Sequence, residues 1–309
     1  MTGPAPEAAS GEKPEVASGL PAYVALHAER ALGGVTRADG ELPVELVHDA
    51  RTSLRRLRAT LRTLPGAFED AAQAEAALQH LALTLGAVRD VDVLAELLPA
   101  ALDRVSADRS IADGPTADGH VSTGGRKVAH ALFCSTFEDL RARAVAAYLR
   151  EAAAAAWADG VGLLRRWVED PPPAPLVDAE GLLAEAEQRV VERLRAAHGE
   201  ISALHTARKA AKRWRYAAEL LEGAPSAAEH LARAEQLQEL LGEVQDLEIA
   251  VELLGQLQDR PGAAAALPAL SVLVDDLRER QRSASIAALA AEDLGGEEIT
   301  PRPSAEPGA

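Results

Sequence analysis

One short basic pattern occurs twice in the chain, and this repeat constrains the fold more than any other feature. The first copy reads HDARTSLRRLR at 48–58, and the second reads HTARKAAKRWR at 205–215, 157 residues later. Each copy is followed by a second element, LGAVRD at 85–90 and LGEVQD at 241–246, which are 156 residues apart. Two elements in the same order at nearly one offset indicate an internal duplication. The simplest architecture is two helical bundles related by a pseudo-twofold axis.

The composition predicts an all-α protein. Aromatic residues make up only 3% of the 309 residues, whereas hydrophobic residues as a whole reach 48%, with Ala and Leu dominant. Strands favour β-branched and aromatic residues, while Ala, Leu, Glu and Arg are strong helix formers. Apolar residues suffice for a buried core, and no segment alternates convincingly as strands do. The periodicity predicts about ten helices, with breaks near Gly86 and Gly242 in the LG elements.

Changes of composition suggest how the chain is organised. The two ends, 1–19 and 293–309, are rich in Ala, Gly, Pro, Ser and Glu, which predicts disordered tails. No helix can continue through DPPPAP, because proline removes a backbone donor and clashes with the preceding turn. We therefore expect one domain over 20–292. Its first helical half spans 20–169 and contains a mobile Gly- and Asp-rich loop at 107–125. A proline-rich linker at 170–175 leads to the second helical half, 176–292.

A helix over the first basic element has one strongly cationic face. At about 100° per residue, five side chains fall within an arc of about 80°: His48, Arg51, Arg55, Arg58 and Arg62. The opposite side is apolar and carries Leu54, Leu57 and Leu61. In the second copy the cationic face carries His205, Arg208, Lys209, Lys212, Arg213, Arg215 and Tyr216. Glu219 stands where the first copy has Arg62, so this second face is shorter.

Positive charge is concentrated on these two helices of an acidic protein. The whole chain has 32 basic and 48 acidic residues, a net charge of −16. Residues 48–62 nevertheless carry +4 and residues 204–218 carry +5, which leaves −25 for the remainder. Like charges stacked along one helix face cost stability. Two interpretations follow: acidic helices neutralise the faces through salt bridges, or the faces bind a phosphate-rich polyanion through forked Arg donors and Lys charges.

The repeated elements together resemble the CHAD family, the conserved histidine α-helical domain. The resemblance covers about residues 20–292 and is carried by HDARTSLRRLRATLRTL at 48–64, LGAVRDVDVL at 85–94, LHTARKAAKRWRYAAELL at 204–221 and LQELLGEVQDLEIA at 237–250. It implies two helical bundles around a basic central channel that binds inorganic polyphosphate. The implied role is binding without catalysis, or targeting to polyphosphate granules, with no cofactor and no metal.

The resemblance also implies which residues bind the ligand. The implied positions are His48, Arg51, Arg55, Arg58, His205, Arg208, Lys209, Lys212, Arg213 and Arg215, with Arg56, Arg62 and Tyr216 as additions. Gln245 stands where the first half has Arg89, so the two halves are not equivalent. We interpret Asp90, Asp92 and Asp246 mainly as structural acids, at helix starts or as partners of basic residues.

Three other functions remain open. His48 and Asp49 form an HD dipeptide like that of metal-dependent phosphohydrolases, although the remaining histidines do not repeat a ligand spacing. The cationic faces could bind nucleic acid, but base-stacking aromatics are scarce and the acidic remainder would repel a long duplex. The faces could instead be buried as ion pairs in a purely structural scaffold.

The sequence also bears on the compartment. The single cysteine, Cys134, excludes an internal disulfide framework and a Cys-based zinc site. Residues 1–19 contain no apolar signal region, and the longest uncharged stretch, 261–274, is too short to span a bilayer. We therefore expect a cytoplasmic protein that does not enter membranes and is associated with polyphosphate granules if it serves as a targeting module.

Overall fold

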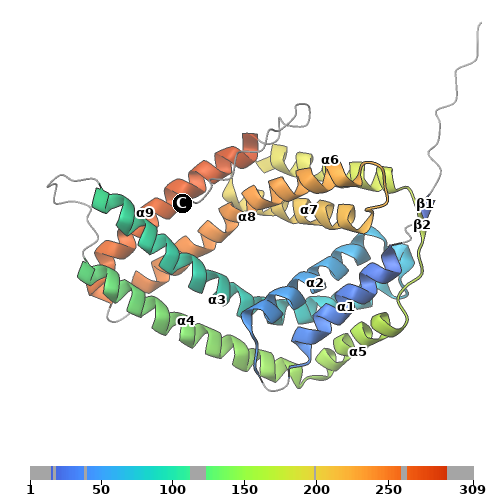
Figure 1. Ribbon diagram of the computed structural model, residues 1–309, viewed down its shortest axis with the longest axis horizontal. Helices are drawn as coiled ribbons and strands as arrows, with labels where there is room; N and C mark the ends of the chain where they lie inside the picture. The colour runs from blue at the N-terminus through green and yellow to red at the C-terminus, as the bar shows by residue number, and fades with distance from the viewer. Residues whose placement is uncertain are drawn as a thin grey trace, which may run out of the picture. The chain divides into compact units, whose positions relative to one another are not determined.

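The computed structural model of the chain describes residues 15–16, 19–37, 40–111, 123–197, 200–258 and 263–290. These residues form nine α-helices, two short 3₁₀ helices and one antiparallel pair of two-residue strands (Figure 1). The fold is therefore all-α, as the composition predicts. In chain order the elements are β1 (Glu15–Val16), α1 (Leu20–Val35), α2 (Val44–Thr63), η1 (Pro65–Ala67), α3 (Ala71–Ile111), α4 (Thr123–Ala152), α5 (Ala155–Glu169), β2 (Leu176–Val177), α6 (Ala179–Ala197), α7 (Ile201–Leu220), α8 (Ala227–Gln258), η2 (Ala263–Ala265) and α9 (Leu267–Ala290).

The described residues fall into two compact units, each built from several segments of the chain. Unit 1 takes its residues from 1–99, 130–186 and 213–232, and unit 2 from 100–129, 187–212 and 233–309. The helices α3, α4, α6, α7 and α8 each contribute one end to either unit. The compact units therefore differ from the two sequence halves separated at 170–175, because long helices run through both units.

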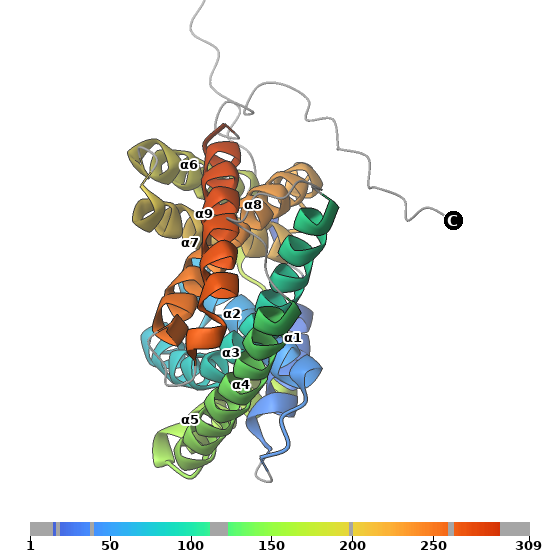
Figure 2. The ribbon, with the colours of Figure 1, turned by 90° about the vertical axis from the view of Figure 1, so that its left-hand side faces the viewer.

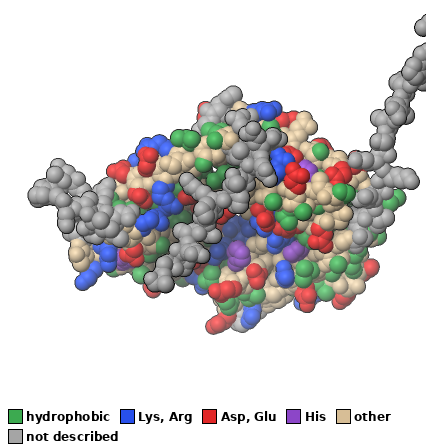
Figure 3. All heavy atoms as spheres, turned by 45° about the horizontal axis from the view of Figure 1, so that its top comes forward, with side chains coloured by type: hydrophobic (Ala, Val, Ile, Leu, Met, Phe, Trp, Pro, Cys, Tyr) green, Lys and Arg blue, Asp and Glu red, His purple; other side chains and the backbone are tan. Residues whose placement is uncertain are grey.

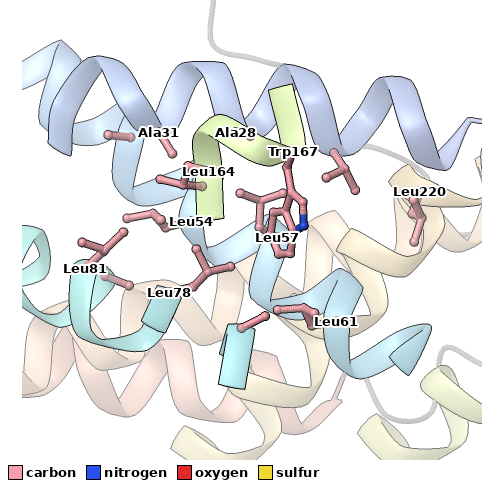
Figure 4. Close-up of a cluster of buried hydrophobic side chains, with 14 of the residues drawn as sticks. Ala28, Ala31, Leu54, Leu57, Leu61, Leu78, Leu81, Leu164, Trp167 and Leu220 are labelled. Carbon is pink, nitrogen blue, oxygen red and sulfur yellow. The ribbon is translucent and has the colours of Figure 1, made fainter. Parts of the chain in front are cut away.

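The core of unit 1 explains why one face of α2 is left polar. α1 packs against α2 and α5 (Figure 1). Leu54, Leu57 and Leu61 of α2 are buried in one cluster with residues of α3, α5 and α7, including Leu78, Leu81, Leu164, Trp167 and Leu220 (Figure 4). A fully buried Leu contributes about 1.5–3 kcal/mol, so this apolar face fixes the rotation of α2. The basic face must then point away from the core.

The contact between α1 and α2 depends on a glycine. A Cβ atom at Gly34 would lie 2.4 Å from the Cβ of Ala50, so only glycine allows the two backbones to approach this closely. Two aromatic side chains satisfy carbonyl groups at the end of α1, which lack helical partners. The Tyr148 hydroxyl donates to the carbonyl of Gly34, and the Trp157 indole donates to that of Val35, both at 3.0 Å.

Unit 2 is also helical and has its own buried leucines. Leu270, Leu273 and Leu277 lie on one side of α9 and are fully buried. Figure 2 shows the ribbons of α8 and α9. Arg280 of α9 donates to Glu243 of α8 at 2.8 Å, which links the two helices. The part of α8 in this unit carries the second LG element.

The two LG elements lie inside continuous helices, not at helix ends. The prediction of breaks near Gly86 and Gly242 is wrong, since α3 and α8 each run through their element without interruption. A helix-interior glycine costs only about 1 kcal/mol relative to alanine, which packing on both sides offsets. Pro99 also lies inside α3, at the point where the helix passes from unit 1 to unit 2.

The predicted tails and loop are mostly outside the described residues. Within the expected N-terminal tail, β1 pairs with β2, which follows the proline-rich segment. The expected loop at 107–125 is shorter than predicted, because α3 extends to Ile111 and α4 begins at Thr123. Residues 112–122 and 291–309 lie outside the described part. Among the helices described, none combines the length and apolar character that crossing a membrane requires.

Candidate functional site

Arg51, the first arginine of the basic face of α2, contacts α3. The guanidinium of Arg51 is next to Gly86, where an added Cβ atom would come within 3.5 Å of its Nε atom. Its Nη2 atom pairs with Asp90, one helical turn further along α3, at 2.9 Å. Arg51 is 24% exposed and Asp90 is 55% exposed, so solvent still reaches the pair. The LG element thus lies against Arg51 and supplies the acid that orients it.

The neighbouring cations have no such acid. Arg55, one turn along α2 from Arg51, donates to the Thr52 hydroxyl at 3.3 Å. Its Nε atom is buried and has no hydrogen-bond partner within the described chain. Neither Arg55 nor Arg89 of α3 forms an ion pair with any carboxylate in the described residues. Two partly buried arginines therefore carry uncompensated charge.

The pKa of His48 is lowered by its surroundings. Partial burial lowers the pKa of this histidine, and the charges of Arg89, Arg55 and Arg51 lower it further, against the opposing effect of Asp49. His48 itself is exposed. We call His48, Arg51, Arg55 and Arg89 the α2–α3 cluster. It combines four basic groups with the single paired acid Asp90.

Further along α2, two arginines share one acid. Arg58 donates through Nε and Nη2 to the Oε1 atom of Glu75 in α3, at 3.0 and 2.9 Å, and Arg62 donates to the same oxygen. Arg58 is 17% exposed and Glu75 is 19% exposed. This carboxylate occupies the groups that a ligand phosphate would need on Arg58 and Arg62.

Arg56 is held in a buried polar network, away from the rest of the basic face. Its Nε and Nη2 atoms donate to both oxygens of Glu219 in α7, at 2.6 and 3.0 Å. The same carboxylate accepts a hydrogen bond from the Tyr23 hydroxyl and pairs with Arg215 at 3.1 Å. The Arg56 guanidinium also lies 5.6 Å from the ring centre of the buried Tyr216. These contacts favour a structural role for Arg56, Arg215 and Tyr216.

The pKa values of the network follow from these contacts. Burial alone would raise the pKa of Glu219, but the hydrogen bonds and charge of Arg56, with the charge of Arg215, outweigh it and lower the pKa. The hydrogen bond to Glu219 raises the pKa of Arg56. Burial, assisted by the charges of Arg56 and Arg30, lowers the pKa of the adjacent His27 to about 4. His27 therefore adds no positive charge at neutral pH.

The second basic element has a related arrangement in unit 2. Nδ1 of His205 is hydrogen-bonded to Oε1 of Gln245 in α8, and Arg208 lies 3.8 Å from Asp246. His205 and Arg208 correspond to His48 and Arg51, while Gln245 and Asp246 correspond to Arg89 and Asp90. The recurrence of the arginine–aspartate pair supports the duplication, which itself stays a prediction. Lys209 and Arg213 are exposed, and Lys212 is half-buried.

Some arginines of the basic faces pair with internal carboxylates, and others have no paired acid among the described residues. Internal carboxylates pair with six of the predicted binding residues: Arg51, Arg56, Arg58, Arg62, Arg208 and Arg215. The α2–α3 cluster nevertheless retains two arginines with no paired acid in the described part of the chain. On the face drawn in Figure 3, Lys and Arg side chains gather near His side chains, with acidic side chains around them. A net negative protein therefore still has a locally positive surface.

Sequence reasoning missed Arg89 as a candidate and did not identify Glu75 as a partner. Gly86 and Asp90 both adjoin Arg51, and Arg89 follows Gly86 by three residues, which places it on the same side of α3 as Gly86. The LGxxRD spacing could have placed Arg89 in the site once the element was known to be helical. Glu75 lies between the first basic element and the first LG element, outside both, and carried no comparable signal.

The described residues offer little for a metal centre. No group of three or more His, Cys, Asp or Glu side chains in the described part of the chain is placed to hold a metal ion. The HD dipeptide brings only His48 and Asp49 together, both exposed on α2. The three aspartates singled out in the sequence are all partners of arginine within helices: Asp90 with Arg51, Asp92 with Arg141, and Asp246 with Arg208.

Comparison with known proteins shows which folds and which family the chain resembles. The chain is similar in fold to PptA from Streptomyces chartreusis, with a TM-score of 0.71 and 22% sequence identity, over 91% of this chain and 99% of that chain. It is also similar to the CHAD domain from the plant Ricinus communis, with a TM-score of 0.61 and 23% identity, over 92% and 95% of the two chains. No curated protein matches the chain. The sequence profile described as CHAD domain matches residues 22–255, which include both basic elements and both LG elements, and the chain therefore belongs to the CHAD domain family.

Proposed function

We propose that this protein binds inorganic polyphosphate without cleaving it, and that the α2–α3 cluster is a principal contact. The observation that carries the proposal is the pair Arg55 and Arg89, which lack an acidic partner within the described residues although Arg55 buries its Nε atom. The other basic residues of α7, His205, Arg208, Lys209, Lys212 and Arg213, are proposed as a further contact.

The energetic argument rests on like charges held together. Arg51 and Arg55 follow one another at four-residue spacing along α2, where like charges repel. Arg89 adds a further positive charge from α3, as the lowered pKa of His48 shows. A fold gains nothing in stability from such an arrangement. An anionic ligand that supplies the missing negative charge explains why the arrangement is retained.

Polyphosphate suits the site because it carries a negative charge on every unit. Each exposed phosphate contact contributes only about 0.5–1 kcal/mol, so affinity must come from many contacts and from the release of counterions. Long chains are therefore expected to bind far more tightly than orthophosphate. The ligand itself is suggested by the CHAD family, and the arginine-rich surface is chemically suited to it.

A competition experiment tests the proposal. The purified chain is titrated with labelled long-chain polyphosphate at fixed salt, with orthophosphate, single-stranded RNA or duplex DNA as competitor. We expect only unlabelled long polyphosphate to compete efficiently at equal phosphate concentration. Equal competition by orthophosphate would exclude multivalent binding, and stronger competition by RNA or DNA would make nucleic acid the ligand. Orthophosphate release on incubation with Mg²⁺ or Mn²⁺ would contradict binding without cleavage.

Binding is expected to tighten as the pH falls from 8 to 6. In the free protein the pKa of His48 is lowered, so the ring is neutral at neutral pH. A bound phosphate would raise that pKa, and ligand binding would then be coupled to uptake of a proton. Between the free and bound pKa values the affinity rises by up to tenfold per pH unit. Titrations with long chains, which have few titrating end groups, measure the effect.

The variant His48→Gln serves as the control for this pH dependence. It removes the titrating ring while keeping a polar side chain at the same exposed position. Its affinity is expected to change much less between pH 8 and pH 6. A pH profile identical to that of the wild type would remove His48 from the account.

The variant Glu75→Gln is expected to bind polyphosphate more tightly. The substitution keeps the shape of the side chain but removes the negative charge that neutralises Arg58 and Arg62. We expect an affinity increase of about three- to tenfold, with a loss of about 1–2 kcal/mol in the free energy of unfolding. Binding titration and thermal denaturation measure the two effects. An unchanged affinity would show that Arg58 and Arg62 serve the fold alone.

A further inference from the structure

The two histidine-led arrangements match residue by residue except in one chemical respect. His48, Arg51 and Asp90 of unit 1 correspond to His205, Arg208 and Asp246 of unit 2, and each arginine approaches its aspartate, at 2.9 and 3.8 Å. The residue that packs near the histidine is Arg89 in the first arrangement and Gln245 in the second. We call His205, Arg208, Gln245 and Asp246 the α7–α8 cluster.

The surroundings of Gln245 make the α7–α8 cluster less positive still. Its side-chain oxygen is hydrogen-bonded to His205, and its Nε2 atom donates to Glu248 at 3.2 Å. Both polar ends of the amide are therefore engaged within the protein. The carboxylate of Glu248 places a negative charge beside the cluster, where it opposes an incoming anion.

The equivalent acid in unit 1 is neutralised. Glu248 corresponds to Asp92, which is buried and pairs with Arg141 at 2.9 Å. Arg141 also donates to the carbonyl of Leu42 and is thereby fixed in place. Asp92 consequently contributes little negative potential to the α2–α3 cluster, and Arg89 contributes a full positive charge. Both differences between the two clusters act in the same direction.

We infer that the two clusters are unequal anion sites: the α2–α3 cluster takes the first phosphate groups of the ligand, and the α7–α8 cluster is the weaker site. Gln245 replaces arginine there, and Glu248 has no cationic partner among the described residues. This inference rests on the proposed function, whose ligand it uses. The ligand class is a short or long linear polyphosphate. The inequality lies within each unit's own residues.

Reciprocal substitution tests the inference. Arg89→Gln is expected to weaken the binding of long-chain polyphosphate by about tenfold, and Gln245→Arg to strengthen it by about three- to tenfold. The double variant, with the two residues exchanged, is expected to return close to the wild-type affinity. Circular dichroism and thermal denaturation of each variant show that the fold is intact.

Two control variants make the same charge changes elsewhere. Gln236→Arg adds a positive charge to α8, about 180° around the helix axis from Gln245, at an exposed position. Arg150→Gln removes a positive charge from an exposed position on α4 in unit 1. Both controls are expected to change the affinity by less than twofold. They separate the local effect of each cluster from the effect of net charge.

A second readout locates the first phosphate groups. In a titration with tripolyphosphate followed by NMR, the imidazole signals of His48 are expected to shift at lower ligand concentration than those of His205. The variants His48→Gln and His205→Gln assign the two sets of signals.

The outcomes distinguish the inference from the function on which it rests. If wild-type protein binds polyphosphate but Gln245→Arg behaves like Gln236→Arg, or the His205 signals shift first, the inequality of the clusters is wrong while the function stands. If wild-type protein binds no polyphosphate of any length, the proposed function fails, and the inference fails with it.

Discussion

Replacing Arg55 and Arg89 together by glutamate is expected to reduce the affinity for long-chain polyphosphate by about 100-fold or more. Each substitution removes an attractive contact of about 0.5–1 kcal/mol and introduces a repulsion of similar size. The two residues are the arginines of the α2–α3 cluster that have no acidic partner in the described residues, so no internal ion pair is broken. Equilibrium binding at low salt measures the loss.

The same double variant is not expected to lose thermal stability. Because Arg55 and Arg89 lie near the positive charge of Arg51, their reversal relieves repulsion within the cluster. We expect a melting temperature equal to or above that of the wild type, together with the loss of binding. The matched control is Arg150→Glu, which reverses an exposed charge on α4. A loss of affinity no larger than in this control would contradict the assignment of the site.

The variant Glu219→Ala is expected to lower the free energy of unfolding by about 3–5 kcal/mol. Glu219 is 15% exposed, and it accepts both guanidinium donors of Arg56 while it also pairs with Arg215. Removing the carboxylate leaves two partly buried cations without their acid, which costs far more than the loss of an exposed ion pair. Chemical denaturation, with the free energy extrapolated to zero denaturant, measures the effect.

Two further variants test the physical cause. Glu222→Ala removes an exposed acid three residues away and is expected to change stability by less than about 0.5 kcal/mol. Glu219→Gln should cost less than Glu219→Ala. Since the pKa of Glu219 is lowered in the folded state, its stabilising effect is present above the ordinary carboxyl pKa of about 4.3 and is lost as the pH falls. A difference between wild type and Glu219→Gln that does not shrink as the pH falls through the acid range would contradict this account.

The repeated elements and the apolar periodicity were enough to predict the helical class and the polar face of α2. Leu54, Leu57 and Leu61 recur at helical spacing, and their burial fixes which face of α2 leaves the core. The breaks expected near Gly86 and Gly242 are wrong because a local propensity was read as a helix end, whereas α3 and α8 continue through both glycines.

Pairing between distant residues could not be read from the sequence. Glu219 was recognised only as an interruption of the second cationic face, and its contacts with Arg56 and Tyr23 join positions far apart in the chain. Glu75 gave no signal at all, although it engages both Arg58 and Arg62. Helical spacing shows which charges share a face. It does not show which acid from another helix reaches them.

The most direct test of the account is the salt dependence of polyphosphate binding, measured for the wild type and for Arg55→Gln. If the α2–α3 cluster contacts the ligand, the logarithm of the affinity should fall linearly with the logarithm of the salt concentration, and the slope should lessen by about 0.7 when this one cation is removed. The control Arg150→Gln should keep the wild-type slope. A slope near zero for the wild type, or one that Arg55→Gln leaves unchanged, would contradict binding through these arginines.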